Sequence, residues 1–181
     1  MKRAVFLDRD GVVNPMERRG ATWGAPLSLA AFEPYPWASE SVGLLRAAGF
    51  PVLVVTNQPE IATGELEPAV LEAMSERLRR DVGVDAVYVC PHRDADGCVC
   101  RKPLPGLLRL AAREWNLDIT ASFMVGDRWR DVGAGRAAGC TTILVDGPMA
   151  EARDTDPRPD YTAADLRDAA RIILTLARGA P

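Results

Sequence analysis

The stretch Val5-Phe6-Leu7-Asp8-Arg9-Asp10-Gly11-Val12-Val13 decides the fold of this chain. The apolar residues 4–7 predict a short buried strand, and Gly11 ends the extended run. Two aspartates lie between them, at the carboxyl end of the strand, where α/β proteins bind their ligands. Two carboxylates this close repel each other, so they need a cation or a shared proton, and a hard divalent ion such as Mg²⁺ fits. The alternative is an ordinary solvated turn after an N-terminal strand.

The composition is that of an ordinary globular protein and argues against several kinds of partner. The chain has 181 residues, of which 48% are hydrophobic and 26% charged, a size that fits one domain spanning residues 1–181. The net charge is −3 with no basic run, which argues against nucleic acid. We see no apolar run of transmembrane length and no signal peptide. We therefore expect a cytoplasmic monomer that binds no membrane.

Predicted strands and helices alternate along the chain. The strands are expected at residues 4–7, 51–55, 85–89, 122–125 and 141–145. The helices are expected at residues 37–48, 67–82, 105–115, 128–138 and 166–177. Residues 14–36 and 150–160 are expected to form irregular loops. This alternation predicts an α/β fold with a doubly wound, mainly parallel sheet.

A cluster of soft metal ligands interrupts the second half of this pattern. Three of the four cysteines and the only histidine lie within eleven residues, as Cys90, His92, Cys98 and Cys100. The C-x-H and C-x-C pairs match a four-coordinate structural Zn²⁺ site, inserted as a loop at residues 90–102. Four protein ligands leave no open position, so this zinc should not be catalytic. The alternative is a set of buried cysteines beside an unrelated histidine.

Polar side chains follow several of the predicted strands at the point where each strand ends. They are Asp8 and Asp10, Thr56 and Asn57, Arg101 and Lys102, and Asp127 with Asp131. The carboxyl ends of parallel strands meet in one crevice, so these groups should lie together. A carboxylate nucleophile, a positioned acid and cationic groups for the equatorial oxygens make a set for phosphoryl transfer.

Four motifs in order resemble those of the haloacid dehalogenase-like phosphatases. They are FLDRDGVVN, VVTNQ, CRKP and MVGDRWRD. The CPH…CVCRKP insert and the FEPYPWA segment are similar to one branch, which contains the D,D-heptose 1,7-bisphosphate phosphatases and the histidinol-phosphate phosphatases. The resemblance covers nearly the whole chain. It implies a capless, Rossmann-like enzyme, because no gap between the motifs is long enough for a cap domain.

The resemblance also implies catalytic roles. Asp8 would be the nucleophile that becomes an aspartyl-phosphate, and Asp10 the general acid and then the base for the attacking water. Thr56 and Lys102 would hold the transferring phosphoryl group. Mg²⁺ would bind Asp8, Asp127 and the backbone carbonyl of Asp10.

Substrate contacts are expected from other residues. Asn57 and Arg101 look like such contacts, and Asp131 would act through its neighbours. Arg18 and Arg19, in the loop after the first motif, are further cations for a distal anionic group. The expected partner is a small-molecule phosphate ester.

The substrate implied first is a heptose 1,7-bisphosphate, and histidinol phosphate is the alternative. The chain departs from the heptose enzymes where Pro59 and Glu60 follow the second motif, and where Thr63 replaces a basic residue. A rival of another class is an inactive binding protein on the same scaffold. The intact catalytic residues argue against it. A zinc-dependent nucleic-acid binder is disfavoured by the low basic charge.

Overall fold

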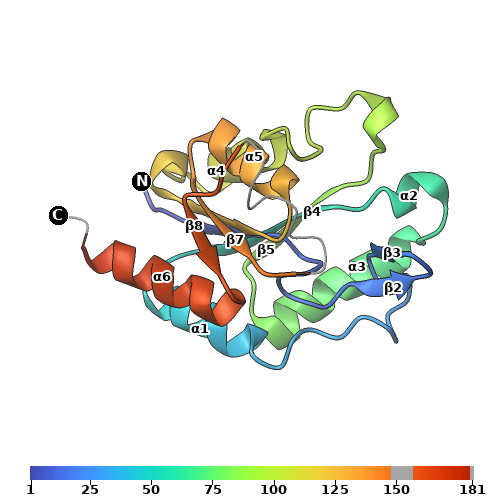
Figure 1. Ribbon diagram of the computed structural model, residues 1–181, viewed down its shortest axis with the longest axis horizontal. Coiled ribbons are helices and arrows are strands. Elements are labelled where there is room, and N and C mark those ends of the chain that lie inside the picture. The colour runs from blue at the N-terminus through green and yellow to red at the C-terminus, as the bar shows by residue number, and fades with distance from the viewer. Residues whose placement is uncertain (148–156, 180–181) are drawn as a thin grey trace.

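The computed structural model describes residues 1–147 and 157–179 (Figure 1). Its main sheet has six strands among these residues, in the order β5-β4-β1-β6-β7-β8, and every neighbouring pair is parallel. The strands are β1 Val5–Leu7, β4 Val52–Asn57, β5 Ala86–Cys90, β6 Phe123–Gly126, β7 Thr141–Val145 and β8 Tyr161–Ala163. The central strand β1 therefore ends between β4 and β6, the strands that carry the second and fourth motifs.

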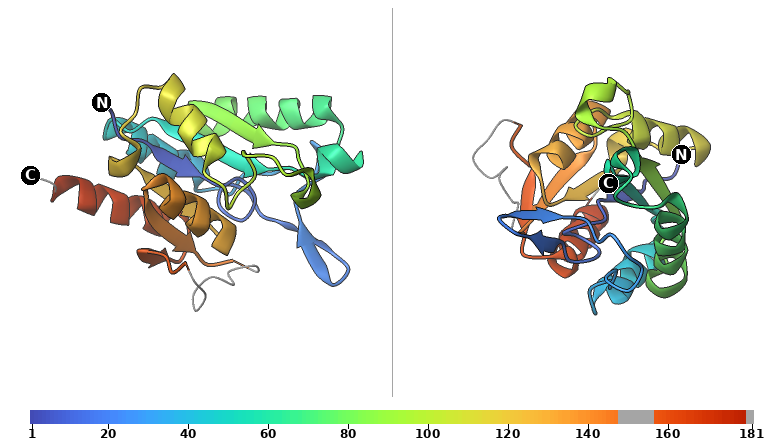
Figure 2. Two further views of the ribbon diagram at one scale, coloured as in Figure 1. Left: turned by 90° about the horizontal axis from the view of Figure 1, so that it is seen from above. Right: turned by 90° about the vertical axis from the view of Figure 1, so that its right-hand side faces the viewer.

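Helices cover both faces of the sheet, as the predicted doubly wound fold requires (Figure 2). One face packs against α1 Ala38–Ala47, α3 Pro68–Arg77 and α6 Leu166–Arg178. The other packs against α4 Gly106–Glu114 and α5 Trp129–Ala138. Val5 and Leu7 point into the first layer while Ala4 and Phe6 point into the second. A strand buried on both faces must be apolar at every position, which explains the uninterrupted apolar run.

Three parts of the chain differ from the sequence-based prediction. The segment 14–36 is not wholly irregular, because β2 Glu17–Arg19 pairs antiparallel with β3 Thr22–Gly24. The sixth strand, β8, was not predicted, since three residues are too short a run to show a period. The helix predicted at 67–82 is α-helical only to Arg77 and continues as a π-helical turn to Val82.

Several short elements complete the chain. A one-turn helix, α2 Glu60–Thr63, follows β4, and 3-10 turns occur at Asp94–Asp96 and Ile119–Ala121. Most of the loop predicted at 150–160 lies outside the described residues, and residues 157–160 lead into β8.

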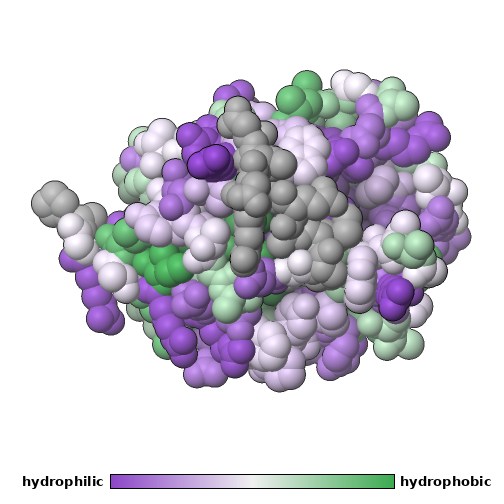
Figure 3. All heavy atoms as spheres, in the orientation of Figure 1, coloured by the Kyte–Doolittle hydropathy of each residue, from purple (hydrophilic) through white to green (hydrophobic). Residues whose placement is uncertain are grey.

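The carboxyl ends of the strands lie at the end of the molecule opposite both chain termini (Figures 1 and 2). The β2–β3 hairpin, α2 and residues 90–102, which are predicted to bind zinc and are called the zinc loop below, gather at this end. No segment of the described chain forms a separate cap domain over them. The face drawn in Figure 3 is mostly hydrophilic, with apolar residues over the half of α6 nearest the C-terminus. No described helix is both long and apolar enough to cross a membrane.

Candidate active site

The side chains of Asp8 and Lys102 form an ion pair at the floor of the crevice. Asp8 directly follows β1, and the Nζ atom of Lys102 lies 2.7 Å from its Oδ1 atom. Lys102 also donates to the carbonyl of Val55 at 2.9 Å and lies 2.6 Å from the Oδ1 atom of Asp131. The Lys102 side chain is only 3% exposed. Burial disfavours its ammonium, but the charges of Asp131 and Asp8 outweigh burial and raise the pKa of Lys102.

Three buried carboxylates surround this single ammonium. Oxygen atoms of Asp8, Asp127 and Asp131 lie within 4.8 Å of one another. Burial raises the pKa of Asp127 to about 8, and the charges of Asp8 and Asp131 add to the effect. Burial likewise raises the pKa of Asp8 to about 6, against the opposing charge of Lys102. When all three are ionised, the carboxylates outnumber the ammonium by two charges, which a divalent cation would balance.

The side chain of Asp127 shows whether the residues present fit a metal ion at this position. Both of its carboxylate oxygens are buried, and neither has a hydrogen-bond partner among the described residues. A buried carboxylate without partners is costly, so these oxygens fit metal ligands better than structural acceptors. Oxygen donors of this kind suit Mg²⁺. The residues present therefore fit the expected ion, and the geometry is compatible with the sequence-based prediction that Asp8 and Asp127 are its side-chain ligands.

Two glycines let the backbone approach these carboxylates. Gly11 has φ +93°, and a Cβ atom there would lie 2.3 Å from Oδ2 of Asp127. At Gly126, a Cβ atom would lie 2.1 Å from the Cβ atom of Asp131. Any side chain at either position would displace a carboxylate of the cluster. Asp131 is held further by the backbone N–H of Arg128, which donates to its Oδ2 atom at 3.0 Å.

Asp10 is held apart from the Asp8 cluster by its own set of donors. Asn14 Nδ2 donates to its Oδ1 atom at 2.9 Å, and Gln58 Nε2 donates to its Oδ2 atom at 2.8 Å. Arg9 Nε donates to both oxygens at 3.1 Å. Asp10 is 8% exposed and lines the crevice, although both of its oxygens already accept hydrogen bonds from neighbouring side chains.

Thr56 and Asn57, at the end of β4, have different hydrogen-bond partners. Thr56 lines the crevice, and its hydroxyl oxygen accepts from Gln58 Nε2 at 2.8 Å. Asn57 also lines the crevice, but its side-chain amide is committed to the backbone of Lys102. It accepts from the Lys102 N–H and donates to the Lys102 carbonyl, both at 3.1 Å. Asn57 therefore fixes the segment that carries the buried lysine.

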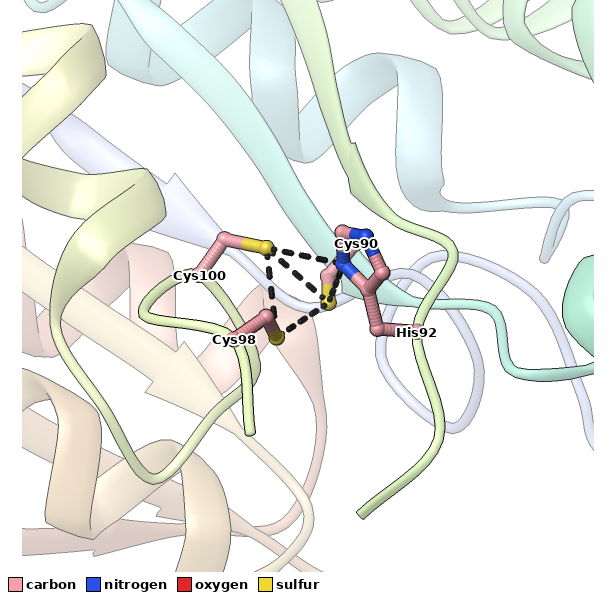
Figure 4. Close-up of side chains that lie close together, drawn as sticks. All are labelled: Cys90, His92, Cys98 and Cys100. Atoms are coloured by element: carbon pink, nitrogen blue, oxygen red, sulfur yellow. Dashed lines mark hydrogen bonds between the residues drawn. The ribbon is translucent and has the colours of Figure 1, made fainter. Parts of the chain in front are cut away.

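The four soft ligands converge at the end of β5 (Figure 4). The sulfurs of Cys90, Cys98 and Cys100 lie 3.2 to 3.7 Å apart, and His92 Nδ1 lies 3.3 Å from Cys100 and 3.6 Å from Cys90. Thiolates bonded to one zinc ion at about 2.3 Å would lie about 3.7 Å apart. Burial alone would raise the pKa of Cys98, but hydrogen bonds from the backbone N–H of Arg101 and from nearby thiols lower this pKa to about 7. The cluster thus fits Zn²⁺ with no disulfide, all four cysteines being free.

Asp94 in the zinc loop links two arginines at the rim of the crevice. Its Oδ1 atom accepts from Arg101 Nε at 2.8 Å and from Arg130 Nη1 at 2.7 Å. These hydrogen bonds hold the pKa of Asp94 well below its usual range. Arg130 comes from α5, and its guanidinium stands 5.1 Å from the ring centre of Trp129. The zinc loop and α5 are therefore joined by a charged contact beside the crevice.

The crevice is small and strongly polar. It encloses about 190 Å³, below the usual range of sites for drug-sized ligands. Three groups of residues line it: the polar residues Asp8, Asp10, Thr56, Asn57, Lys102 and Asp131; the residues Met16, Trp23, Gly24, Ala25, Pro59 and Glu60 around the hairpin and α2; and three arginines, Arg101, Arg128 and Arg130, called the arginine wall below. Arg128 also contacts the hairpin side, since its Nη2 atom lies 3.5 Å from the sulfur of Met16. Arg18 and Arg19 are not among the lining residues: Arg18 contacts the Gly20 carbonyl, and Arg19 the Ala25 carbonyl and Glu65.

The comparisons with known proteins agree with one another. A family model described as HAD-hydrolase-like matches residues 99–169. The D-glycero-beta-D-manno-heptose-1,7-bisphosphate 7-phosphatase of Pseudomonas aeruginosa is 40% identical over 146 residues, 78% of this chain and 79% of the relative. The enzyme of that name from Escherichia coli K12 is 34% identical over 184 residues, 94% and 93% of the two chains.

The chain belongs to the HAD-like phosphatases. A crystal structure of D,D-heptose 1,7-bisphosphate phosphatase from B. bronchiseptica, complexed with magnesium and phosphate, is 34% identical and has a TM-score of 0.84. The match covers 97% of this chain and 99% of that one. The predicted HAD-like, Rossmann-like fold is thereby confirmed. The magnesium of that relative agrees with the metal fit at Asp127.

This HAD-like phosphatase also places residues at the site that the sequence analysis missed. Arg9 and Gln58 are fully buried behind Asp10 and Thr56, and Asn14 touches Asp10. Arg128 and Arg130 line the crevice instead of Arg18 and Arg19. The only sequence signal for Arg9 was its position between two aspartates at a buried strand end. Nothing in a single sequence shows that an arginine one residue before Asp10 turns inward.

Proposed function

We propose that this protein is a Mg²⁺-dependent phosphatase that removes the 7-phosphate of D-glycero-β-D-manno-heptose 1,7-bisphosphate. The observation that carries the proposal is the buried Asp8 carboxylate, paired with Lys102 in a crevice that three arginines also line. The relatives that span most of the chain at 32 to 40% identity bear this enzyme's name. The magnesium and phosphate of the similar crystal structure add support.

The proposed reaction has two halves. An oxygen of Asp8 attacks phosphorus, the bond from phosphorus to the sugar oxygen breaks, and Asp10 gives that oxygen a proton. Water then attacks the phosphorus of the aspartyl-phosphate, Asp10 takes its proton, and Asp8 leaves as a carboxylate. The Thr56 hydroxyl and the Lys102 ammonium hold the phosphoryl oxygens throughout. A Mg²⁺ ion held by Asp8, Asp127 and the Asp10 carbonyl would neutralise charge on those oxygens when bound.

We assign the distal phosphate to the arginine wall. Arg101, Arg128 and Arg130 line the crevice and can offer paired N–H groups to phosphate. Asp94 holds Arg101 and Arg130 together, so their guanidiniums stand side by side without needing a ligand. Arg18 and Arg19 on the hairpin remain the sequence-based alternative for this contact.

The zinc cluster has a structural role in the proposal. The loop from Cys90 to Cys100 has little apolar content, so metal binding would supply its folding energy. Arg101 and Lys102 directly follow the last ligand, and zinc would fix the backbone that aims both cations. The free thiols that the site needs agree with the predicted cytoplasmic, reducing compartment. The monomeric state stays a prediction.

A substrate comparison tests the proposal. Purified protein with Mg²⁺ is given the β-heptose 1,7-bisphosphate, its α anomer, histidinol phosphate and p-nitrophenyl phosphate, and kcat/KM is measured for each. We expect both bisphosphates to exceed histidinol phosphate and p-nitrophenyl phosphate, because only a bisphosphate engages the arginine wall and the nucleophile together. The names of the relatives lead us to expect that the β anomer exceeds the α anomer. A higher kcat/KM for histidinol phosphate would overturn the substrate assignment while keeping the chemistry. No turnover of any ester by zinc-loaded protein would favour the inactive binding protein.

A further inference from the structure

Arg9 lies in the sequence between the two aspartates of the first motif, yet it does not line the crevice. Its side chain is 1% exposed. The guanidinium stands 5.4 Å from the ring centre of Phe32, and Nη1 lies 3.8 Å from the sulfur of Met74. A buried arginine of this kind is retained only with good partners. Its partners are Asp10 and Gln58.

The Gln58 amide connects Asp10 to Thr56. Gln58 is 0% exposed, and its Oε1 atom accepts from Arg9 Nη2 at 2.9 Å. Its Nε2 atom donates to Asp10 Oδ2 and to Thr56 Oγ1, both at 2.8 Å. An arginine has donors only, so the amide oxygen must face Arg9 and the nitrogen must face the other two. Arg9 thereby fixes which way the amide points.

This orientation determines what the two crevice groups can do. Because Thr56 Oγ1 already accepts a hydrogen bond from Gln58, its own hydrogen is free to point at another acceptor, such as a phosphoryl oxygen in the crevice. Asp10 Oδ2 is held by Gln58 and by Arg9, whose Nη2 atom lies 3.0 Å away. The Gln58 amide therefore orients both the Asp10 carboxyl and the Thr56 hydroxyl.

We propose that Arg9 and Gln58 are positioning residues for this reaction. Gln58, oriented by Arg9, holds the Asp10 carboxyl where it protonates the leaving oxygen, and directs the Thr56 hydroxyl toward the transferring phosphoryl group. Neither residue touches substrate. The inference rests on the proposed function in one respect, the role of Asp10 as general acid.

Leaving-group dependence is the test. An alkyl oxygen needs a proton to leave, whereas p-nitrophenolate leaves without one, so loss of a well-placed acid affects alkyl esters most. Gln58→Leu removes both donated hydrogen bonds without adding charge. Arg9→Lys keeps a cation beside Asp10 but cannot bind Asp10 and Gln58 as a fork. We expect either variant to lose about 100-fold in kcat/KM on the sugar phosphate and about fivefold or less on p-nitrophenyl phosphate. The ratio kcat/KM ends at the departure of the leaving group, so it excludes the later hydrolysis of the aspartyl-phosphate, in which Asp10 serves both esters alike.

Thr142→Val is the matched control for lost stability. Thr142 is a buried residue of β7, and its hydroxyl donates to Asp160 Oδ2 at 2.7 Å, away from the crevice. Melting temperatures of all variants are recorded, and this variant should keep the wild-type ratio of the two activities. If Gln58→Leu does not fold, Arg9→Lys decides the matter alone.

The outcomes separate cleanly. A selective loss on the alkyl ester in Gln58→Leu or Arg9→Lys, absent from Thr142→Val, supports the positioning role. Equal losses on both esters, no loss, or the same selectivity in the control would overturn it. If the wild-type protein did not hydrolyse the heptose bisphosphate, the proposed substrate would fail. The comparison would then use glycerol phosphate or another alkyl ester that the protein turns over.

Discussion

Two ligand clusters lie near the carboxyl end of this sheet, and they are built in opposite ways. The carboxylates of Asp8, Asp127 and Asp131 are buried around one ammonium, and two of their oxygens have no hydrogen-bond partner among residues 1–147 and 157–179. The cluster of Cys90, His92, Cys98 and Cys100 is less buried and closes on itself with four protein ligands. An open, oxygen-only site suits a metal that must meet substrate, and a closed sulfur site suits one that must not. From this difference we propose a catalytic metal at the first cluster and a structural metal at the second.

Of the substitutions considered, removal of the Asp8 charge should lower the activity most. Asp8→Asn keeps the size of the side chain but loses the nucleophile, so we expect kcat to fall by at least about 10⁴-fold. Zinc content and circular dichroism should match the wild-type protein. Turnover within tenfold of wild type would exclude Asp8 as the nucleophile.

Breaking the second cluster should affect stability and activity together. In Cys100→Ser we expect loss of zinc, a melting temperature lower by at least about 5 °C, and a roughly 100-fold lower kcat because Arg101 and Lys102 lose their fixed backbone. Added Mg²⁺ should not restore the activity.

Cys140→Ser makes the same chemical change in a buried cysteine outside the cluster. It should keep one zinc per chain and full activity. Metal analysis of freshly purified wild-type protein gives the reference. A fully active, zinc-free preparation would contradict the structural role of the metal.

The arginine wall connects the two clusters, because Arg101 lies in the zinc loop, Arg130 lies in α5, and Asp94 pairs with both. Arg101→Ala and Arg130→Ala should each raise KM for the bisphosphate about tenfold, through loss of charge-assisted hydrogen bonds to phosphate. The KM for a monophosphate should change by about twofold at most. Arg18→Ala is measured in the same assay. A larger increase in Arg18→Ala than in Arg130→Ala would place the distal phosphate at the hairpin.

The smallest effect is expected at Asp94, whose side chain is 64% exposed. Asp94→Asn leaves one acceptor oxygen for the arginines but removes the charge that pairs them. An exposed ion pair contributes little in water, so we expect KM for the bisphosphate to rise by about two- to threefold with kcat unchanged. The rise should shrink in high salt. A change in kcat instead would mean that Asp94 supports the floor of the crevice.

Much of this molecule could be predicted from its sequence, and the exceptions have physical reasons. The central strand, the flanking helices and the cluster of Cys90, His92, Cys98 and Cys100 follow from local patterns of apolar residues, cysteines and histidine. The β2–β3 hairpin has no alternating apolar pattern, because only part of it faces the crevice. The positions of Arg128 and Arg130 at the crevice could not be predicted, because they depend on the angle at which α5 leaves the sheet. The contact between Arg9 and Gln58 could not be predicted either, because it depends on which way their two side chains turn inside the core.

The most direct test of the account is phosphorus NMR of the reaction with D-glycero-β-D-manno-heptose 1,7-bisphosphate. Wild-type protein with Mg²⁺ should release inorganic phosphate, consume the signal of the 7-phosphate and leave the 1-phosphate signal in place. Asp8→Asn at the same concentration should leave both signals unchanged. Release of the 1-phosphate, or an unchanged spectrum with folded, zinc-loaded wild-type protein, would contradict the proposed function.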